Sequence, residues 1–186
     1  MLTTLKNYVI IFLKREVKKM SKTKKALKKM NKVMSAELAS FGIDKAKYTG
    51  EYSYSFKKNR VDYKLTNDAI EDKWFREFVK ERFRYEIKSD FIISLLHEIG
   101  HAKANEEITG DILDFCLNEK ARIGIEMMVA ENEETGRALS FQYFSLPDEI
   151  MATQWAVNYA ETHKKELKKM LKRITPVIEE YQRNRG

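Results

Sequence analysis

The 186-residue chain is poor in cysteine, proline and glycine, with one, two and seven of them respectively. Its single cysteine, Cys116, excludes a disulfide within the chain and is typical of a reducing compartment, so we expect a cytoplasmic location. The scarcity of proline and glycine favours long helices joined by short connections. The apolar run at residues 8–13 is far shorter than the about 20 residues that a membrane-spanning helix needs, so no transmembrane segment is predicted.

The composition indicates a soluble globular protein whose charge is unevenly distributed along the sequence. Hydrophobic residues make up 43% and charged residues 34%, in a chain long enough for one substantial core. Residues 1–35 hold eleven Lys or Arg against one acid, whereas the remaining 151 residues hold 24 against 27. The overall charge of +7 therefore comes from the N-terminal segment. We expect a basic N-terminal helical arm at residues 1–42 and a second domain at residues 43–186.

Three interpretations of the basic arm are open. Its apolar residues recur at spacings of three and four, which predicts a helix that packs on the rest of the protein and ends near Gly42. These residues are Leu27, Met30, Met34, Leu38 and Phe41. The positive charge would also suit nucleic acid or an anionic membrane surface as a partner. We favour the packed helix, because periodicity is the stronger signal.

The rest of the chain predicts an α+β fold that is mainly helical. Alternating residues at 51–57 and 60–65 predict a small antiparallel β-hairpin. Amphipathic helices are predicted over residues 68–83 and 164–182. Between them, residues 111–130 predict one helix, followed by a polar loop at residues 131–136. From its position in the chain, our hypothesis is that this segment covers a cleft.

A candidate metal site lies in the middle of the chain. Residues 97–101 read His-Glu-Ile-Gly-His, and only one other histidine is present. Positions four apart share a face of a helix, so His97 and His101 can point at one metal ion. The apolar run at residues 91–96 predicts that this helix is buried. The pattern is typical of a Zn²⁺ site in which the intervening glutamate, Glu98, acts as general base.

A catalytic zinc ion normally takes a third protein ligand, and Glu149 is the best candidate. Ser145 and Asp148 predict a capping box at the start of a helix that contains Glu149. One stripe of this helix would hold small residues that permit close packing against the histidine helix, at Ala152 and Ala156. Thr153, one turn after Glu149, could hydrogen-bond a ligand and orient it.

Other side chains compete for roles at this site. Glu126 lies in an apolar run, and since a buried unpaired carboxylate is costly it is the second candidate for the third ligand. His163 follows Glu149 by 14 residues, about 21 Å along a helix, so the two cannot share one ion on a continuous helix. Tyr143 and Tyr159 are possible donors to an oxyanion, although we favour ordinary packing as the role of both.

Together, the two motifs resemble those of the gluzincin metallopeptidases. The matching residues are His97, Glu98 and His101, followed by Glu149, Ala152, Trp155 and Ala156. The resemblance is greatest to the ImmA/IrrE-type proteins and to small zincin-like peptidases of phages and prophages, and covers roughly residues 88–165. It implies zinc held by His97, His101 and Glu149, with Glu98 as base. It also implies a small sheet over the histidine helix, whose edge strand pairs with an extended substrate. Thr153 departs from the Asp or Asn usual in the family.

The sequence therefore predicts a zinc-dependent endopeptidase that cleaves a specific cytoplasmic protein, with a phage- or prophage-related role implied by the resemblance. The alternative is a protein that binds nucleic acid or another partner through its basic arm. In that case the zinc site would be structural or inactive as a peptidase.

Overall fold

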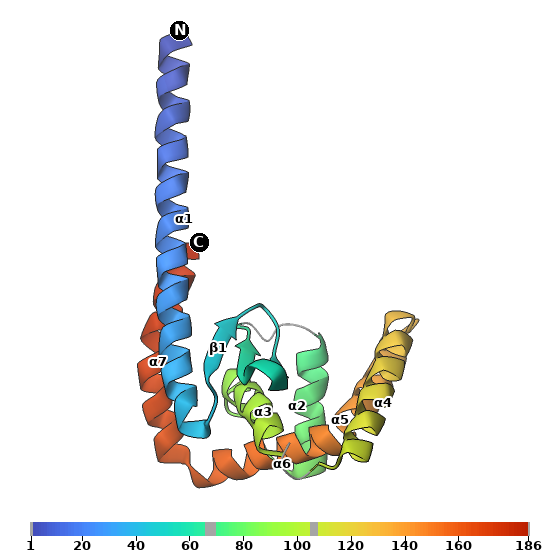
Figure 1. Cartoon of the computed structure of the whole chain (residues 1–186). Helices are drawn as coiled ribbons and strands as arrows, with labels where there is room; N and C mark the ends of the chain where they lie inside the picture. The colour runs from blue at the N-terminus through green and yellow to red at the C-terminus, as the bar shows by residue number, and fades with distance from the viewer. Residues whose placement is uncertain (1, 66–69, 105–107, 186) are drawn as a thin grey trace.

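The computed structural model describes residues 2–65, 70–104 and 108–185, and within them the fold is α+β and mainly helical, as predicted. These residues form seven α-helices and a small three-stranded sheet (Figure 1). The helices are α1 Leu2–Leu38, α2 Ile70–Phe83, α3 Asp90–Ala104, α4 Gly110–Met128, α5 Glu133–Phe144, α6 Pro147–Thr162 and α7 Lys164–Arg185. The strands are β1 Lys45–Tyr48, β2 Ser53–Ser55 and β3 Arg60–Tyr63.

The sheet has the order β1-β3-β2 and packs on α3. Strands β2 and β3 are antiparallel, which confirms the hairpin, and a short 3₁₀ helix, η2 (Phe56–Lys58), joins them. The sequence did not predict β1, which pairs with β3 in parallel and makes the sheet mixed. Strand β1 has four residues of which only Ala46 is buried, too short an alternation to recognise. Side chains of α1 cover its outer edge, since Ser35 Oγ accepts from the Ala46 N–H at 2.8 Å.

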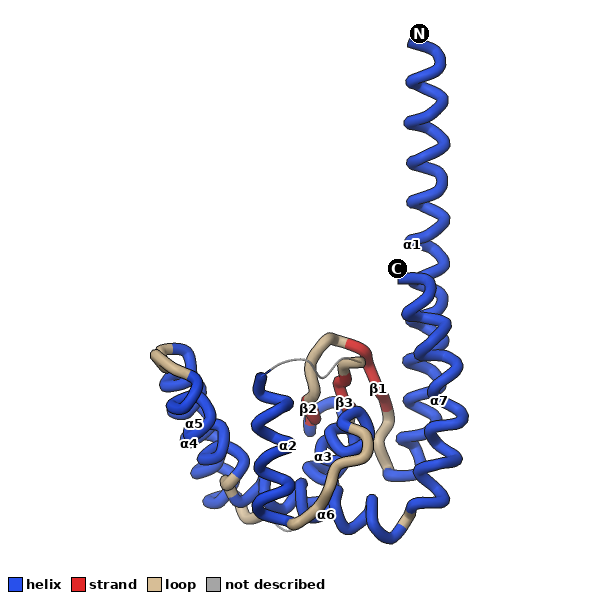
Figure 2. Tube along the Cα trace, turned by 180° about the vertical axis from the view of Figure 1, so that it is seen from behind, coloured by secondary structure: helices blue, strands red, loops and turns tan. Residues whose placement is uncertain are grey.

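The apolar stripe of the basic arm packs on the body, as predicted. Met30, Met34 and Leu38 are fully buried in the same core as residues of α3, α6 and α7. Helices α1 and α7 lie side by side, and both views show α1 continuing past the C-terminal end of α7 (Figures 1 and 2). Gly42, with a φ of 81°, follows a short 3₁₀ turn and ends the helical segment. The division of the chain at residue 42 stays a prediction.

Helices α4 and α5, which lie between the two motifs in sequence, form a helical hairpin. Helix α4 matches its prediction, but the polar loop expected at residues 131–136 was wrong, because α5 begins inside it. The Asn132 side chain accepts a hydrogen bond from the Thr135 N–H at 2.8 Å and caps α5. The acidic residues that suggested a loop are favourable in the first turn of a helix, where they face the positive end of its dipole. Among the described residues, no helix is long and apolar enough to cross a membrane.

Helices α3 and α6 are in backbone contact, and this contact positions the candidate site. Gly100 lies against Ala152, and a Cβ atom on Gly100 would be only 2.3 Å from the Ala152 carbonyl oxygen. The small residues predicted for the α6 stripe thus allow the close approach. Because Gly100 lies between His97 and His101 on α3, the same contact brings both histidines to the first turns of α6.

Gly100→Ala is expected to destabilise the protein by about 3 kcal/mol, since the added methyl group must push two backbones apart. Gly124→Ala is the matched control, because Gly124 is also helical and has nothing within 4 Å of its missing Cβ. That change should stabilise α4 by about 0.5–1 kcal/mol through helix propensity. Urea denaturation of the two variants measures both effects. Equal stability of Gly100→Ala and the wild type would contradict the close contact.

Candidate metal centre

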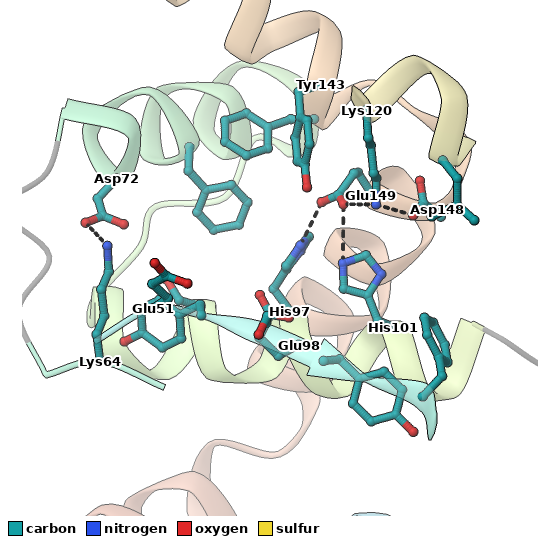
Figure 3. A pocket seen from close by; sticks show the side chains of 18 of the residues that line it. Glu51, Lys64, Asp72, His97, Glu98, His101, Lys120, Tyr143, Asp148 and Glu149 are labelled. Atoms are coloured by element: carbon teal, nitrogen blue, oxygen red, sulfur yellow. Dashed lines mark hydrogen bonds and ion pairs between the residues drawn. The ribbon is translucent and has the colours of Figure 1, made fainter. Parts of the chain in front are cut away.

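Helix α3 carries both histidines of the first motif. Ser89 Oγ accepts a 3.4 Å hydrogen bond from the Ile92 N–H near the start of α3, and residues 92–100 are buried, as predicted. His97 and His101 lie one turn apart, with ring centroids separated by 4.7 Å (Figure 3). His97 is buried and His101 half-buried. Both imidazoles therefore lie on the same face of a helix that the core holds in place.

Helix α6 supplies Glu149 from its first turn, although it does not begin as predicted. The capping box was wrong, because Leu146 is the residue before the helix and no side chain caps it. Ser145 instead closes α5, with its Oγ donating to the Phe141 carbonyl oxygen at 2.6 Å. Since α5 ends directly before α6, Ser145 is used by the earlier helix. Pro147 occupies the first turn of α6, where its missing N–H costs nothing.

The structure brings the three predicted ligand residues together. One ligand atom from each of His97, His101 and Glu149 lies within 4.8 Å of the others. Glu149 Oε2 is 2.9 Å from His97 Nε2, and its other oxygen is 3.5 Å from His101 Nε2 (Figure 3). Two imidazoles and one carboxylate form a donor set that catalytic zinc uses, with a fourth position left for water or substrate. These residues thus fit a metal ion.

The charge state of Glu149 also suits a ligand. Glu149 is only 2% exposed, and burial by itself raises the pKa of a carboxyl group. The charge and hydrogen bonds of His101 and His97 outweigh this effect and hold the pKa of Glu149 well below its ordinary value. Glu149 is therefore ionised at neutral pH, as a metal-binding carboxylate must be.

Thr153 orients one of the imidazoles. Its Oγ1 lies 3.0 Å from His97 Nδ1, so the hydrogen bond proposed from the sequence for this residue is present. The contact directs Nε2 of the same ring toward Glu149. Phe75 packs edge-on against the His97 ring at 5.2 Å and restricts its rotation further. The Thr153 hydroxyl thus takes the place of the carboxylate or carbonyl group that usually hydrogen-bonds the second ring nitrogen of a metal-binding histidine.

Glu98 is a buried carboxyl group beside the two histidines. It is 7% exposed and lies in the wall of a cavity that also contains His97, His101 and Glu149. Burial raises the pKa of Glu98 to about 7; nearby His97 opposes this rise and Glu149 adds to it. A carboxyl group with a pKa near neutrality is well matched to both accepting and releasing a proton.

Lys120 of α4 is a member of the site that the sequence did not reveal. Its Nζ lies 2.5 Å from Glu149 Oε1 and also pairs with Asp148 (Figure 3). Burial opposes the charge of Lys120, but Glu149 more than compensates and raises the pKa of the ammonium group above its ordinary value. A lysine in an amphipathic helix normally faces solvent, so only the docking of α4 on α6 could show this role.

Lys120→Met is expected to lower the unfolding free energy of the metal-free protein by about 2 kcal/mol, because two buried carboxylates lose a partner. The loss is moderated because 21% of the Lys120 side chain is exposed. Zinc should then stabilise this variant more than it stabilises the wild type, since the ion supplies the missing charge. Lys172→Met, at an exposed position of α7, is the control. Urea denaturation with and without zinc measures the free energies of unfolding. An equal loss of stability in the two variants would contradict a role for Lys120.

The structure places the other candidate residues either at the cavity or away from it. Glu126 pairs with Arg122 at 2.5 Å on the outer side of α4, where 44% of its side chain is exposed, so it is not part of the metal-binding group. His163 is exposed just after the end of α6 and stacks on Tyr159 at 4.0 Å. Tyr159 contacts other rings away from the cavity, whereas Tyr143 lines the cavity and lies near Glu149 (Figure 3).

An open cavity of about 580 Å³ lies over the three ligand residues. Its walls come from the segment around β2, from α4 and from the end of α5. The predicted covering loop at residues 131–136 does not line it; α4 does so instead, through Leu113, Leu117 and Lys120. Access to the candidate centre is therefore shaped by a helix inserted between the two motifs.

No model of a known protein family matches the chain, and comparisons with curated proteins and with solved structures find no similar protein. The fold and the site define an α+β, mainly helical protein with a buried His-His-Glu group that could hold a metal ion.

Proposed function

We propose that the chain is a zinc-dependent endopeptidase of the gluzincin type, which cleaves a specific protein in the cytoplasm. The observation that carries this proposal is the group formed by His97, His101 and Glu149, whose ligand atoms lie within 4.8 Å of one another. The position of Glu98 in the wall of the same cavity supports an enzymatic over a purely structural site. A structural zinc site normally has four protein ligands and no open cavity.

Bound by these three residues, zinc would polarise a peptide carbonyl and lower the pKa of a water molecule towards about 7. The protein's own side chains supply the remaining functions. Glu98 accepts the proton of the attacking water and passes it to the leaving amine. Burial raises the pKa of Tyr143, as does the charge of Glu149, so its phenol stays protonated and able to donate a hydrogen bond. We assign it to the oxygen of the scissile carbonyl.

Strand β2 supports a polypeptide as substrate. Among the described residues it pairs with β3 alone, so its other edge has no strand partner. Residues 50–54 and Phe56 line the cavity, which places this edge beside the ligand residues. An extended peptide can add to such an edge through backbone hydrogen bonds. The resemblance of the two motifs to phage and prophage peptidases favours a regulatory role, with one or a few protein targets.

The direct test is zinc-dependent hydrolysis of a peptide pool. The purified protein is loaded with one equivalent of zinc and incubated with peptides from a digested bacterial lysate, and new termini are identified by mass spectrometry. We expect cleavage at a limited set of sites, loss of cleavage after removal of zinc by a chelator, and recovery when zinc is returned. If the zinc-loaded protein produces no new termini from either the peptide pool or intact lysate proteins, the peptidase proposal is wrong.

A further inference from the structure

Two large apolar side chains are exposed at the wall of the cavity. Phe56 of η2 is 46% exposed and Leu117 of α4 is 56% exposed, and both line the cavity. They come from elements about sixty residues apart in sequence. Exposed apolar side chains that converge on a cavity mark a binding surface more often than isolated ones do.

The α4 wall of the cavity follows helical spacing. Leu113, Leu117 and Lys120 occur at positions i, i+4 and i+7, so they share one face, and all three line the cavity. The face of α4 that packs on the protein is a neighbouring one, with Cys116 and Ile123 buried. Lys120 is held by Glu149, but the two leucines border open space. Their apolar surface is therefore available to an occupant of the cavity.

The wall next to β2 is an ordered aromatic pair. The rings of Phe56 and Tyr54 meet edge to face with centroids 4.8 Å apart. The Tyr54 hydroxyl donates to Asn59 Oδ1 at 2.9 Å, which ties the pair to the end of η2. Because these rings are held in place, an occupant that contacts them loses little binding energy to ordering the protein.

The surroundings of the two apolar walls restrict what the occupant can be. Five carboxyl groups also line the cavity, and they disfavour a lipid chain or a membrane surface; they belong to Glu51, Asp72, Glu98, Asp148 and Glu149. The free edge of β2 offers backbone donors and acceptors that an extended polypeptide can pair with. An extended peptide fits both the polar edge and the apolar walls, since its backbone can pair with β2 while one of its side chains reaches the apolar walls.

We propose, on the basis of the peptidase function above, that the cavity selects an extended substrate segment with a bulky apolar residue, held between Leu117 and Phe56. Burial of one leucine- or phenylalanine-sized side chain corresponds to about a 10- to 100-fold gain in affinity. Leu117 and Phe56 are thus specificity-determining residues. The three ligand residues do not distinguish one peptide bond from another.

The test uses full-length Glu98→Gln protein, which retains the ligand residues and lacks the proposed base, so that bound peptides are not cleaved. This protein is immobilised with and without zinc and exposed to a displayed library of random ten-residue peptides. Sequencing of the retained and input pools gives the enrichment of each residue type. Leu117→Gln and Phe56→Ser are introduced into the same background. Both positions are exposed, and Phe56→Ser also removes the ring contact with Tyr54. Ile125→Gln is the matched control, because Ile125 is 66% exposed on the same helix and does not line the cavity.

We expect retained peptides to be enriched in Leu, Ile, Met, Phe, Tyr or Trp at one position, with binding about tenfold weaker in Leu117→Gln and unchanged in Ile125→Gln. Retention without apolar enrichment, or equal binding by the two glutamine variants, would overturn the inference and leave the peptidase function standing. Failure to retain any peptide while zinc is bound would also overturn it. Absence of zinc binding would instead count against the proposed function, and the zinc-free arm would still show whether the apolar walls select peptides.

Discussion

Zinc is expected to bind in a ratio of one ion per chain, and both His97→Ala and Glu149→Ala are expected to abolish this binding. The free energy of zinc binding is about 10–16 kcal/mol at structural sites of zinc-finger peptides and is shared among few ligands. By that measure, the loss of one ligand should weaken affinity by at least about a thousandfold. Elemental analysis of the purified proteins gives the stoichiometry. Competition with a chromophoric chelator gives the affinities.

Glu126→Ala is the control for this prediction, because Glu126 is the other carboxylate considered for the site and pairs with Arg122 on the surface of α4. It should bind zinc as the wild type does. Circular dichroism of each variant separates the loss of a ligand from the loss of the fold. Zinc binding that survives Glu149→Ala and disappears with Glu126→Ala would identify Glu126 as the third ligand. A wild-type protein that takes up no zinc would remove the basis of the proposed function.

Glu98→Gln is expected to retain zinc and to lose peptidase activity by about a hundredfold to ten-thousandfold, the usual contribution of a general acid–base group. The amide has almost the same size but cannot accept the proton of water. Because Glu98 is buried and burial disfavours its charged form, the neutral amide should not lower the thermal midpoint. Zinc content, thermal denaturation and the rate of peptide hydrolysis together test these statements.

The matched control is Glu51→Gln, since Glu51 is an exposed carboxylate that lines the same cavity and lies on the side of β2 (Figure 3). It should keep most of the activity. If Glu98→Gln hydrolyses peptides within tenfold of the wild-type rate while Glu51→Gln does not, the role of base belongs to a different carboxylate. If both retain full activity, proton transfer in this cavity does not depend on either residue.

Local patterns in the sequence were sufficient for most helices and for two of the ligand residues. The histidines four residues apart on an apolar helix required no tertiary information, because the geometry of one helix places both on one face. The spacing of Glu149, Thr153 and the small residues around them also predicted which side of α6 meets α3. The two sites of contact, Gly100 with Ala152 and His97 with Thr153, agree with that spacing.

Patterns failed where short segments depend on their neighbours. Strand β1 is defined by its pairing with β3 and by the side chains of α1 along its edge, which no four-residue pattern encodes. The start of α5 was mistaken for a loop, because acidic residues suit both solvent and a helix N-terminus. The predicted cap at Ser145 failed for a related reason, since its hydroxyl completes the preceding helix.

By itself, the sequence determined the α+β, mainly helical fold and the buried helix that carries both histidines, because each of these depends on the periodicity of a single element. Only the tertiary structure decided between Glu149 and Glu126, since both lie on helices and the choice depends on which helix packs against α3. It alone placed Lys120 on Glu149 and the apolar walls of Phe56 and Leu117 beside the same cavity. These contacts join residues from different elements, and the relative placement of elements is set by packing of the whole core, which a local pattern does not contain.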